Sequence, residues 1–370
     1  MEVEVICHGP ESSVSGITGS SFPEIEGDSG EQNDKHLIQV TQVERLPKRI
    51  LWSENALSSA IVAILKSRAA GTAKIIWISK LKMAKYIPIA RSLGYRVIFD
   101  EPIAKSSKHL SLALLSMQRW TGVLTSARTA YHEERFCSAS HAVVTGSEID
   151  ASRLKKLVPE VPIYVIPAAV DTSQVSAFRN IEGGNLFTYA NLNSPGGLES
   201  LRWFAKEVLP KLKAHYGNRP LPRIVVSGNQ TLLKKSSLLQ RNKTIDFLRA
   251  TGLAVYPEPR SVLTHLSEAA VVFFPIQAGP DMRYRILESM AAAKPVVATG
   301  RAALGLVLSP TYDIYIADRA DSFASALVRL LRDPVAREEI GMRAAKTARE
   351  KYDWRCSRGV LDGLLSSIDL

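Results

Sequence analysis

Three charged residues, Arg283, Arg285 and Glu288, lie within six positions of one another. The apolar residues around them recur at helical spacing, which places all three on one predicted helix. Arginines and free backbone N–H groups near a helix start hold phosphate, and a carboxylate can accept hydrogen bonds from ribose hydroxyls. The chemistry that suits this set is the binding of a nucleoside diphosphate.

The same three charges have an interpretation that needs no ligand. Arginine–glutamate groups are often only surface ion pairs, and a carboxylate near a helix start is stabilised by the helix dipole. Charge logic alone therefore leaves both interpretations open.

A buried strand leads into the predicted helix. Residues 271–274 form an apolar run ended by Pro275, which is typical of a parallel strand covered on both faces. Lys294 and Pro295 stop the helix before a second strand at residues 296–298. Ligands of open α/β sheets bind at the carboxyl ends of the strands, and the charged segment follows such an end.

Composition limits the class of protein. The 370 residues are 46% hydrophobic and 22% charged, which predicts a globular chain of two domains and excludes a disordered one. The three cysteines, Cys7, Cys137 and Cys356, show neither a disulfide framework nor a Cys-x-x-Cys metal pattern. No signal-like segment or membrane-spanning run is present, so we expect a cytoplasmic protein, with peripheral association at the inner face of the membrane as an option.

The net charge of +11 is unevenly distributed. Residues 1–34 hold eight acidic side chains and no lysine or arginine, whereas residues 35–172 carry +10 and residues 173–370 carry +9. The positive charge of both regions suits the binding of anionic donors, acidic lipids or nucleic acid. The chain lacks a zinc knuckle, an aromatic RNA-binding signature and a recognition-helix pattern, so we expect no nucleic-acid partner.

Strand and helix patterns alternate along the chain, which predicts parallel βαβ units. We expect an N-terminal Rossmann-like acceptor domain at residues 1–172, with a flexible acidic loop at 9–35, and a C-terminal Rossmann-like donor domain at 180–354. A last helix at 355–370 is expected to pack back on the first domain. The predicted fold class is α/β, with two doubly wound domains facing each other across a cleft.

Several motifs carry a family resemblance. They are Phe187-Thr-Tyr-Ala-Asn191, Asn193-Ser-Pro195, Ile224-Val-Val-Ser-Gly228, Leu287-Glu288 with Lys294-Pro-Val-Val, and Tyr352-Asp-Trp354. Together they resemble glycosyltransferase family 4 (glycosyl transferases group 1) of the GT-B fold, close to the sugar transferases of exopolysaccharide-type systems. The resemblance covers about residues 130–360.

The resemblance implies a hexosyltransferase-type enzyme that moves a sugar from a nucleotide diphosphate-sugar, such as a UDP- or GDP-sugar, to an acceptor hydroxyl. Retention of configuration and independence of metals and other cofactors are expected. The acceptor would be a carbohydrate, a lipid-linked molecule or a small molecule, in polysaccharide, glycolipid or glycoconjugate biosynthesis. Glu288 would bind the ribose, and Arg285 and Arg283 would hold the diphosphate and stabilise its developing charge.

Further candidates fall at other predicted strand ends and loops. The donor-binding candidates are Asn191, Asn193, Gly228, Tyr256, Gly279, Asp281, Met282 and Leu287, in addition to the charged three. Asp100 is a candidate acid–base group, although it could also merely cap a helix. Glu101 and His8 are candidates for acceptor contact, and a surface role for His8 is the plain alternative.

Departures from the family pattern keep other functions open. Pro280 stands where many members carry a second glutamate, and Asp281 would place negative charge near a diphosphate. These changes motivate a catalytically weak or inactive sugar-nucleotide-binding or scaffold protein as one alternative. A sugar-nucleotide epimerase is another. An NAD-dependent dehydrogenase is disfavoured because no Gly-x-Gly-x-x-Gly fingerprint follows a predicted strand.

Overall fold

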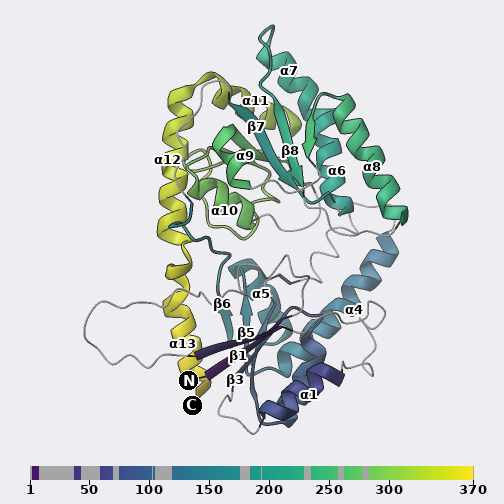
Figure 1. Ribbon diagram of the computed structural model, residues 1–370, viewed down its shortest axis with the longest axis vertical. Coiled ribbons are helices and arrows are strands. Elements are labelled where there is room, and N and C mark those ends of the chain that lie inside the picture. The colour runs from purple at the N-terminus through teal and green to yellow at the C-terminus, as the bar shows by residue number, and fades with distance from the viewer. Residues whose placement is uncertain are drawn as a thin grey trace, which may run out of the picture. The chain divides into compact units, whose positions relative to one another are not determined.

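The computed structural model describes residues 2–7, 37–42, 59–69, 75–101, 103–104, 119–175, 184–192, 194–228, 235–256, 262–277 and 283–369. The predicted acidic loop at 9–35 lies outside these residues, as does part of a helical region that the apolar pattern predicts at about 105–137. The chain divides into two compact units, which Figure 1 shows as ribbons. Unit 1 comprises residues 1–109, 123–166 and 360–370, and unit 2 comprises residues 110–122 and 167–359.

Unit 1 is built on a parallel sheet in the order β2-β1-β3-β4-β5-β6. Its strands are β1 (Glu2–Cys7), β2 (Leu37–Gln42), β3 (Ile75–Ser79), β4 (Arg96–Asp100), β5 (Ala142–Thr145) and β6 (Ile163–Val165). Its helices are α1 (Ser59–Arg68), η2 (Ala84–Tyr86), α2 (Ile87–Ser92), α4 (Arg119–Ser138, which begins in unit 2), α5 (Glu148–Leu157) and α13 (Arg358–Asp369).

The alternation of side chains along β4 separates two cores in unit 1. Val97 and Phe99 join one apolar cluster, whereas Ile98 joins another on the opposite face. Leu364 and Ile368 of α13 belong to the cluster of Ile98. The C-terminal helix therefore supplies part of the apolar cover of this sheet.

Unit 2 repeats the parallel design in the order β12-β11-β10-β7-β8-β9. Its strands are β7 (Asn185–Ala190), β8 (Ile224–Gly228), β9 (Ala254–Tyr256), β10 (Ala269–Phe274), β11 (Val296–Ala298) and β12 (Tyr315–Ile316). Its helical segments are α6 (Pro195–Trp203), η3 (Phe204–Val208), α7 (Leu209–Tyr216), α8 (Lys235–Ala250), α9 (Val262–Glu268), α10 (Arg283–Ala291), α11 (Ala320–Arg332), α12 (Pro334–Lys351) and η4 (Trp354–Ser357).

The strand order of unit 2 reverses direction at β7. The chain runs from β7 outward through β8 to β9, and then returns to the other side of β7 with β10. Such a reversal is the point at which open α/β sheets bind ligands, outside the carboxyl ends of the strands. Residues 191–192 and 275–277, which follow β7 and β10, flank this point.

Apolar spacing predicts one helix at residues 197–215, but the structure divides this region into α6, η3 and α7. A π-helical turn, η3, separates α6 from α7, and Pro210 lies in the first turn of α7. Proline has no backbone N–H to donate to the carbonyl group four residues earlier, so the regular α-helical ladder is interrupted there. None of the helices in the described ranges combines the length and apolar character that crossing a bilayer requires.

Candidate functional site

Helix α10 carries the charged residues that the sequence singled out. Ile286, Leu287 and Met290 are fully buried in the core between the helix and the sheet. Burial of this face leaves Arg285 and Glu288 partly accessible, with 27% and 12% of their side-chain surfaces exposed. Because α10 follows β10, these two residues come from the segment that begins at the reversal point of the sheet.

Arg285 and Glu288 form an ion pair. Nη1 of Arg285 donates to Oε2 of Glu288 at 2.6 Å. Burial alone would lower the pKa of Arg285, but the charge of Glu288 and the hydrogen bond to it raise this pKa above its ordinary value. Glu288 is the sixth residue of α10, and the first turn of this helix has no acidic residue. The dipole at a helix start therefore does not account for the position of Glu288.

Two tyrosine rings flank the guanidinium of Arg285. Its central carbon lies 4.4 Å from the ring centroid of Tyr189 on β7 and 5.6 Å from that of Tyr284. Both distances are within the range of cation–π attraction. Tyr189 is only 8% exposed, so its ring is a fixed surface against which Arg285 rests. Sequence reasoning missed this residue as part of the site, although it precedes the end of β7 by one position.

Arg283 occupies a different environment from Arg285. Its side chain is 4% exposed. It lies close enough to Tyr352 for its charge to act on that phenol: burial raises the pKa of Tyr352, and Arg283 opposes the rise. Of the two arginines predicted to hold a diphosphate, Arg285 is the more accessible one.

The turn after β7 is fixed by backbone contacts. The carbonyl oxygen of Asn191 accepts hydrogen bonds from both the N–H and the hydroxyl group of Ser194, each at 3.2 Å. Ser194 in turn caps α6 by accepting from the N–H of Gly197 at 3.0 Å. A Cβ atom on Gly197 would lie 2.2 Å from the Asn191 oxygen, so only glycine allows this close approach. The backbone of Asn191 forms a turn beside the reversal point.

Three other donor candidates have structural contacts. A Cβ atom on Gly228 would lie 2.3 Å from the side chain of Leu192, which explains a glycine at the end of β8. The hydroxyl group of Tyr256 accepts from Arg223, and its ring lies 5.6 Å from that of His265. The side chain of Leu287 belongs to the core.

The candidates of unit 1 lie at and beyond the end of β4. Asp100 is half-buried and accepts a hydrogen bond from the hydroxyl group of Ser79 at 2.8 Å. Glu101 is fully buried, and its N–H donates to the Val144 carbonyl oxygen. Burial raises the pKa of the Cys137 thiol, and the charges of Glu133 and Glu101 add to the rise. Glu101 is therefore part of the interior rather than of the surface.

Several predicted residues lie outside the described part of the chain. These are His8, Asn193, Gly279, Pro280, Asp281 and Met282. Their assigned roles stay predictions. Among the residues that the structure does describe, no group of three histidine, cysteine, aspartate or glutamate side chains is arranged to hold a metal ion.

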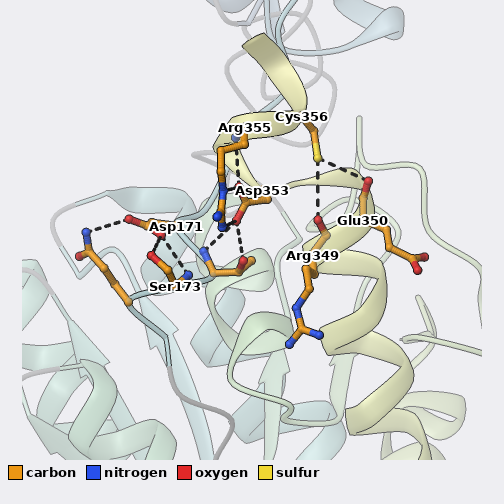
Figure 2. A network of polar contacts seen from close by, with 9 residues as sticks. Asp171, Ser173, Arg349, Glu350, Asp353, Arg355 and Cys356 are labelled. Atoms are coloured by element: carbon orange, nitrogen blue, oxygen red, sulfur yellow. Dashed lines mark hydrogen bonds and ion pairs between the residues drawn. The ribbon is translucent and has the colours of Figure 1, made fainter. Parts of the chain in front are cut away.

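A second arginine–carboxylate pair was not anticipated from the sequence. The carboxylate of Asp353 accepts from Nε and Nη2 of Arg355 at 2.5 and 2.8 Å, and from the hydroxyl group of Thr172 at 2.5 Å (Figure 2). The N–H groups of Arg355 and Thr172 also donate to it. These bonds hold the pKa of Asp353 far below its usual range, chiefly through Arg355. The network borders an open pocket of about 520 Å³.

Comparison with known proteins places the chain in a structural class. Residues 185–333 match the family model of glycosyl transferases group 1. No curated protein sequence matches the chain. Sucrose-phosphate synthase from Thermosynechococcus elongatus is similar in structure, with a TM-score of 0.73 at 12% identity over 99% of this chain and 98% of the other.

Two further solved structures are similar. HepE from Anabaena, in complex with UDP and glucose, gives a TM-score of 0.62 at 13% identity over 90% of this chain and 86% of the other. Trehalose-6-phosphate synthase gives a TM-score of 0.64 at 14% identity over 99% and 98%. The α/β fold class and the resemblance to glycosyl transferases group 1 are confirmed. Residues 185–333 of unit 2 thus match the model of glycosyl transferases group 1, and the chain has the GT-B fold.

Proposed function

We propose that this protein transfers a sugar from a nucleotide diphosphate-sugar to an acceptor hydroxyl group. The observation that carries the proposal is the Arg285–Glu288 pair, which α10 presents after the strand that reverses the sheet order of unit 2. A carboxylate that can accept from a vicinal diol and a guanidinium that can bind a diphosphate lie one helical turn apart. The family match over the same residues supports this assignment.

The chemistry follows from where charge develops. As the bond between the sugar and the diphosphate breaks, negative charge accumulates on the leaving phosphate. Arg285, which rests against the rings of Tyr189 and Tyr284, can stabilise that charge. Glu288 orients the nucleotide through the ribose. The buried charge of Arg283 adds a longer-range contribution of the same sign.

The proposal also covers the donor nucleotide, the stereochemistry of transfer and the biosynthetic role. The HepE structure contains UDP and glucose, which favours a UDP-sugar among the donors. We infer transfer with retention and without a metal ion, in the synthesis of a polysaccharide, glycolipid or glycoconjugate. The net charge of +11 suits an anionic donor and peripheral contact with acidic lipids at the inner face of a membrane.

A thermal-shift screen tests the donor site directly. UDP, GDP, ADP, dTDP and their common sugar conjugates would each be added to the full chain. A ligand at 100 times its dissociation constant stabilises the folded state by about 2.7 kcal/mol, which raises the unfolding midpoint of a unit of this size by roughly 5 °C or more. We expect at least one nucleoside diphosphate to produce such a shift. If none does, the proposed donor site is wrong.

A further inference from the structure

Two groups that the proposed function assigns to different parts of the donor bind each other in the structure. Arg285, assigned to the diphosphate, donates to Glu288, assigned to the ribose. A donor that takes up Nη1 of Arg285 and Oε2 of Glu288, the two atoms that face each other, must therefore give each of them a new partner. The contact with Glu288 and the contact with Arg285 are therefore coupled during donor binding. The proposed function by itself does not describe this coupling.

The pair is held more firmly than an exposed ion pair. Its two side chains are mostly buried, and the guanidinium lies against the ring of Tyr189 on a neighbouring strand. Among the residues that the structure describes, Arg285 is the only hydrogen-bonding partner that the Glu288 carboxylate has. Separating the two charges leaves a partly desolvated cation and a partly desolvated anion, each of which needs compensation.

We propose that the Arg285–Glu288 pair is a latch that opens for ligands offering a diol and a diphosphate together. The proposal rests on the proposed donor site. A nucleoside engages Glu288 but leaves Arg285 without an anion. Pyrophosphate engages Arg285 but leaves Glu288 unpaired. A nucleoside diphosphate compensates both groups at once. Its binding free energy therefore exceeds the sum of the binding free energies of the nucleoside and of pyrophosphate.

The latch is tested by one substitution that should change the affinities for the nucleoside and for its diphosphate in opposite directions. Isothermal titration of the full chain would compare the nucleoside with its diphosphate, using the base that gives the largest thermal shift. Arg285→Met removes the latch and the diphosphate ligand together. We expect this variant to bind the nucleoside about tenfold more tightly, because Glu288 no longer has to leave a charged partner. The diphosphate should bind about tenfold more weakly, because its own partner is lost.

Tyr189 provides a second test as a positioning residue. Tyr189→Leu removes the ring behind Arg285, so it should shift both affinities in the same directions as Arg285→Met but by about threefold. Tyr189→Phe keeps the ring and should restore most of the wild-type discrimination. Thermal midpoints of all variants, measured alongside, identify any that fail to fold, and the two positions test the latch independently.

The outcomes separate this inference from the proposed function. If the wild type binds the nucleoside diphosphate but Arg285→Met weakens the nucleoside and its diphosphate alike, the latch is wrong and the donor site stands. Equal affinities of wild type and Tyr189→Leu for both ligands would likewise count against it. If the wild type binds no nucleoside diphosphate, both the donor site and the latch are overturned.

Discussion

Unit 2 contains two arginine–carboxylate pairs, and their carboxylates differ in exposure and in the number of hydrogen bonds that they accept. Asp353 is 3% exposed and accepts five hydrogen bonds from Arg355 and Thr172. Glu288 accepts one from Arg285, and 12% of its side chain remains accessible. A buried carboxylate with all of its acceptor positions occupied serves the fold. One that retains acceptor capacity at the carboxyl edge of a parallel sheet is free to serve a ligand.

The surroundings of the two pairs reinforce this difference. The N–H of Val170 donates to the Tyr352 carbonyl oxygen at 2.8 Å. The N–H of Trp354 donates to the Val170 carbonyl oxygen at 3.2 Å. The Asp353 network therefore joins the beginning of the long segment of unit 2, near residue 167, to the end of that segment, near residue 359. The Arg285–Glu288 pair lies on a single helix, and the guanidinium of Arg285 also lies against the ring of Tyr189 on β7.

Replacing Asp353 should have the largest effect on stability. Asp353→Ala removes the acceptor of five hydrogen bonds and leaves the partly buried donors of Thr172 without their acceptor. We expect the free energy of unfolding of unit 2 to fall by about 4 kcal/mol, measured by urea denaturation. Nucleotide affinity at a temperature where the variant is folded should stay within about twofold of wild type. A large loss of affinity with unchanged stability would reverse the roles assigned to the two pairs.

Replacing Glu288 should lower activity strongly and stability only slightly, the reverse of what we expect for Asp353. Glu288→Gln keeps the size of the side chain but removes the charge that orients the ribose, so we expect turnover of the donor to fall about 100-fold. The free energy of unfolding should fall by less than about 2 kcal/mol, less than in Asp353→Ala, because the glutamine amide oxygen can still accept the single hydrogen bond from Arg285. Glu338→Gln on α12, an exposed residue of the same unit, is the matched control and should behave as wild type. Full activity of Glu288→Gln would remove the donor assignment.

Lys294 extends the comparison to a buried cation that donates to a neutral group. Its Nζ donates to the Ala269 carbonyl oxygen at 2.9 Å, and burial lowers its pKa from 10.5 to about 8. The folded pKa is below the unfolded one, so the buried charge costs stability below pH 8 and this cost is relieved as the pH rises toward 10.5. Between pH 7 and 9.5 the relief amounts to about 2 kcal/mol.

Lys294→Met checks this assignment. The Met variant lacks the titrating group, so its free energy of unfolding relative to wild type should decline by that amount over the same pH range. Urea titrations of both proteins at pH 7 and 9.5 measure the difference. Parallel pH profiles would show that Lys294 does not titrate as assigned.

Much of the fold could be predicted from periodicity. Apolar spacing and flanking turn residues predict strands at 185–190, 254–256 and 296–298 and helices at 235–250 and about 320–332, and the structure has these bounds. The strand order could not be read, because it depends on pairing between distant segments. The π turn at 204–208 was missed because helical periodicity is the same on both sides of it.

The site was predictable only in part, for physical reasons. Arg285 and Glu288 are three positions apart on one helix, so their proximity follows from sequence. The contact between Arg285 and Tyr189 joins residues almost 100 positions apart and needs the fold. The different burial of Arg283 and Arg285 depends on which face of α10 meets the core. Asp353 was noted only as part of the motif Tyr352-Asp-Trp354, and its contact with Thr172, 181 positions away, needs the fold.

The central claim is that unit 2 binds and activates a nucleotide diphosphate-sugar at the Arg285–Glu288 pair. The most direct measurement is ³¹P NMR of the full chain incubated with a panel of UDP-, GDP-, ADP- and dTDP-sugars, with and without simple sugar acceptors. We predict release of the nucleoside diphosphate from at least one donor, and its loss in Glu288→Gln but not in Glu338→Gln. If the wild type cleaves no sugar nucleotide under any of these conditions, the proposed transferase activity is contradicted.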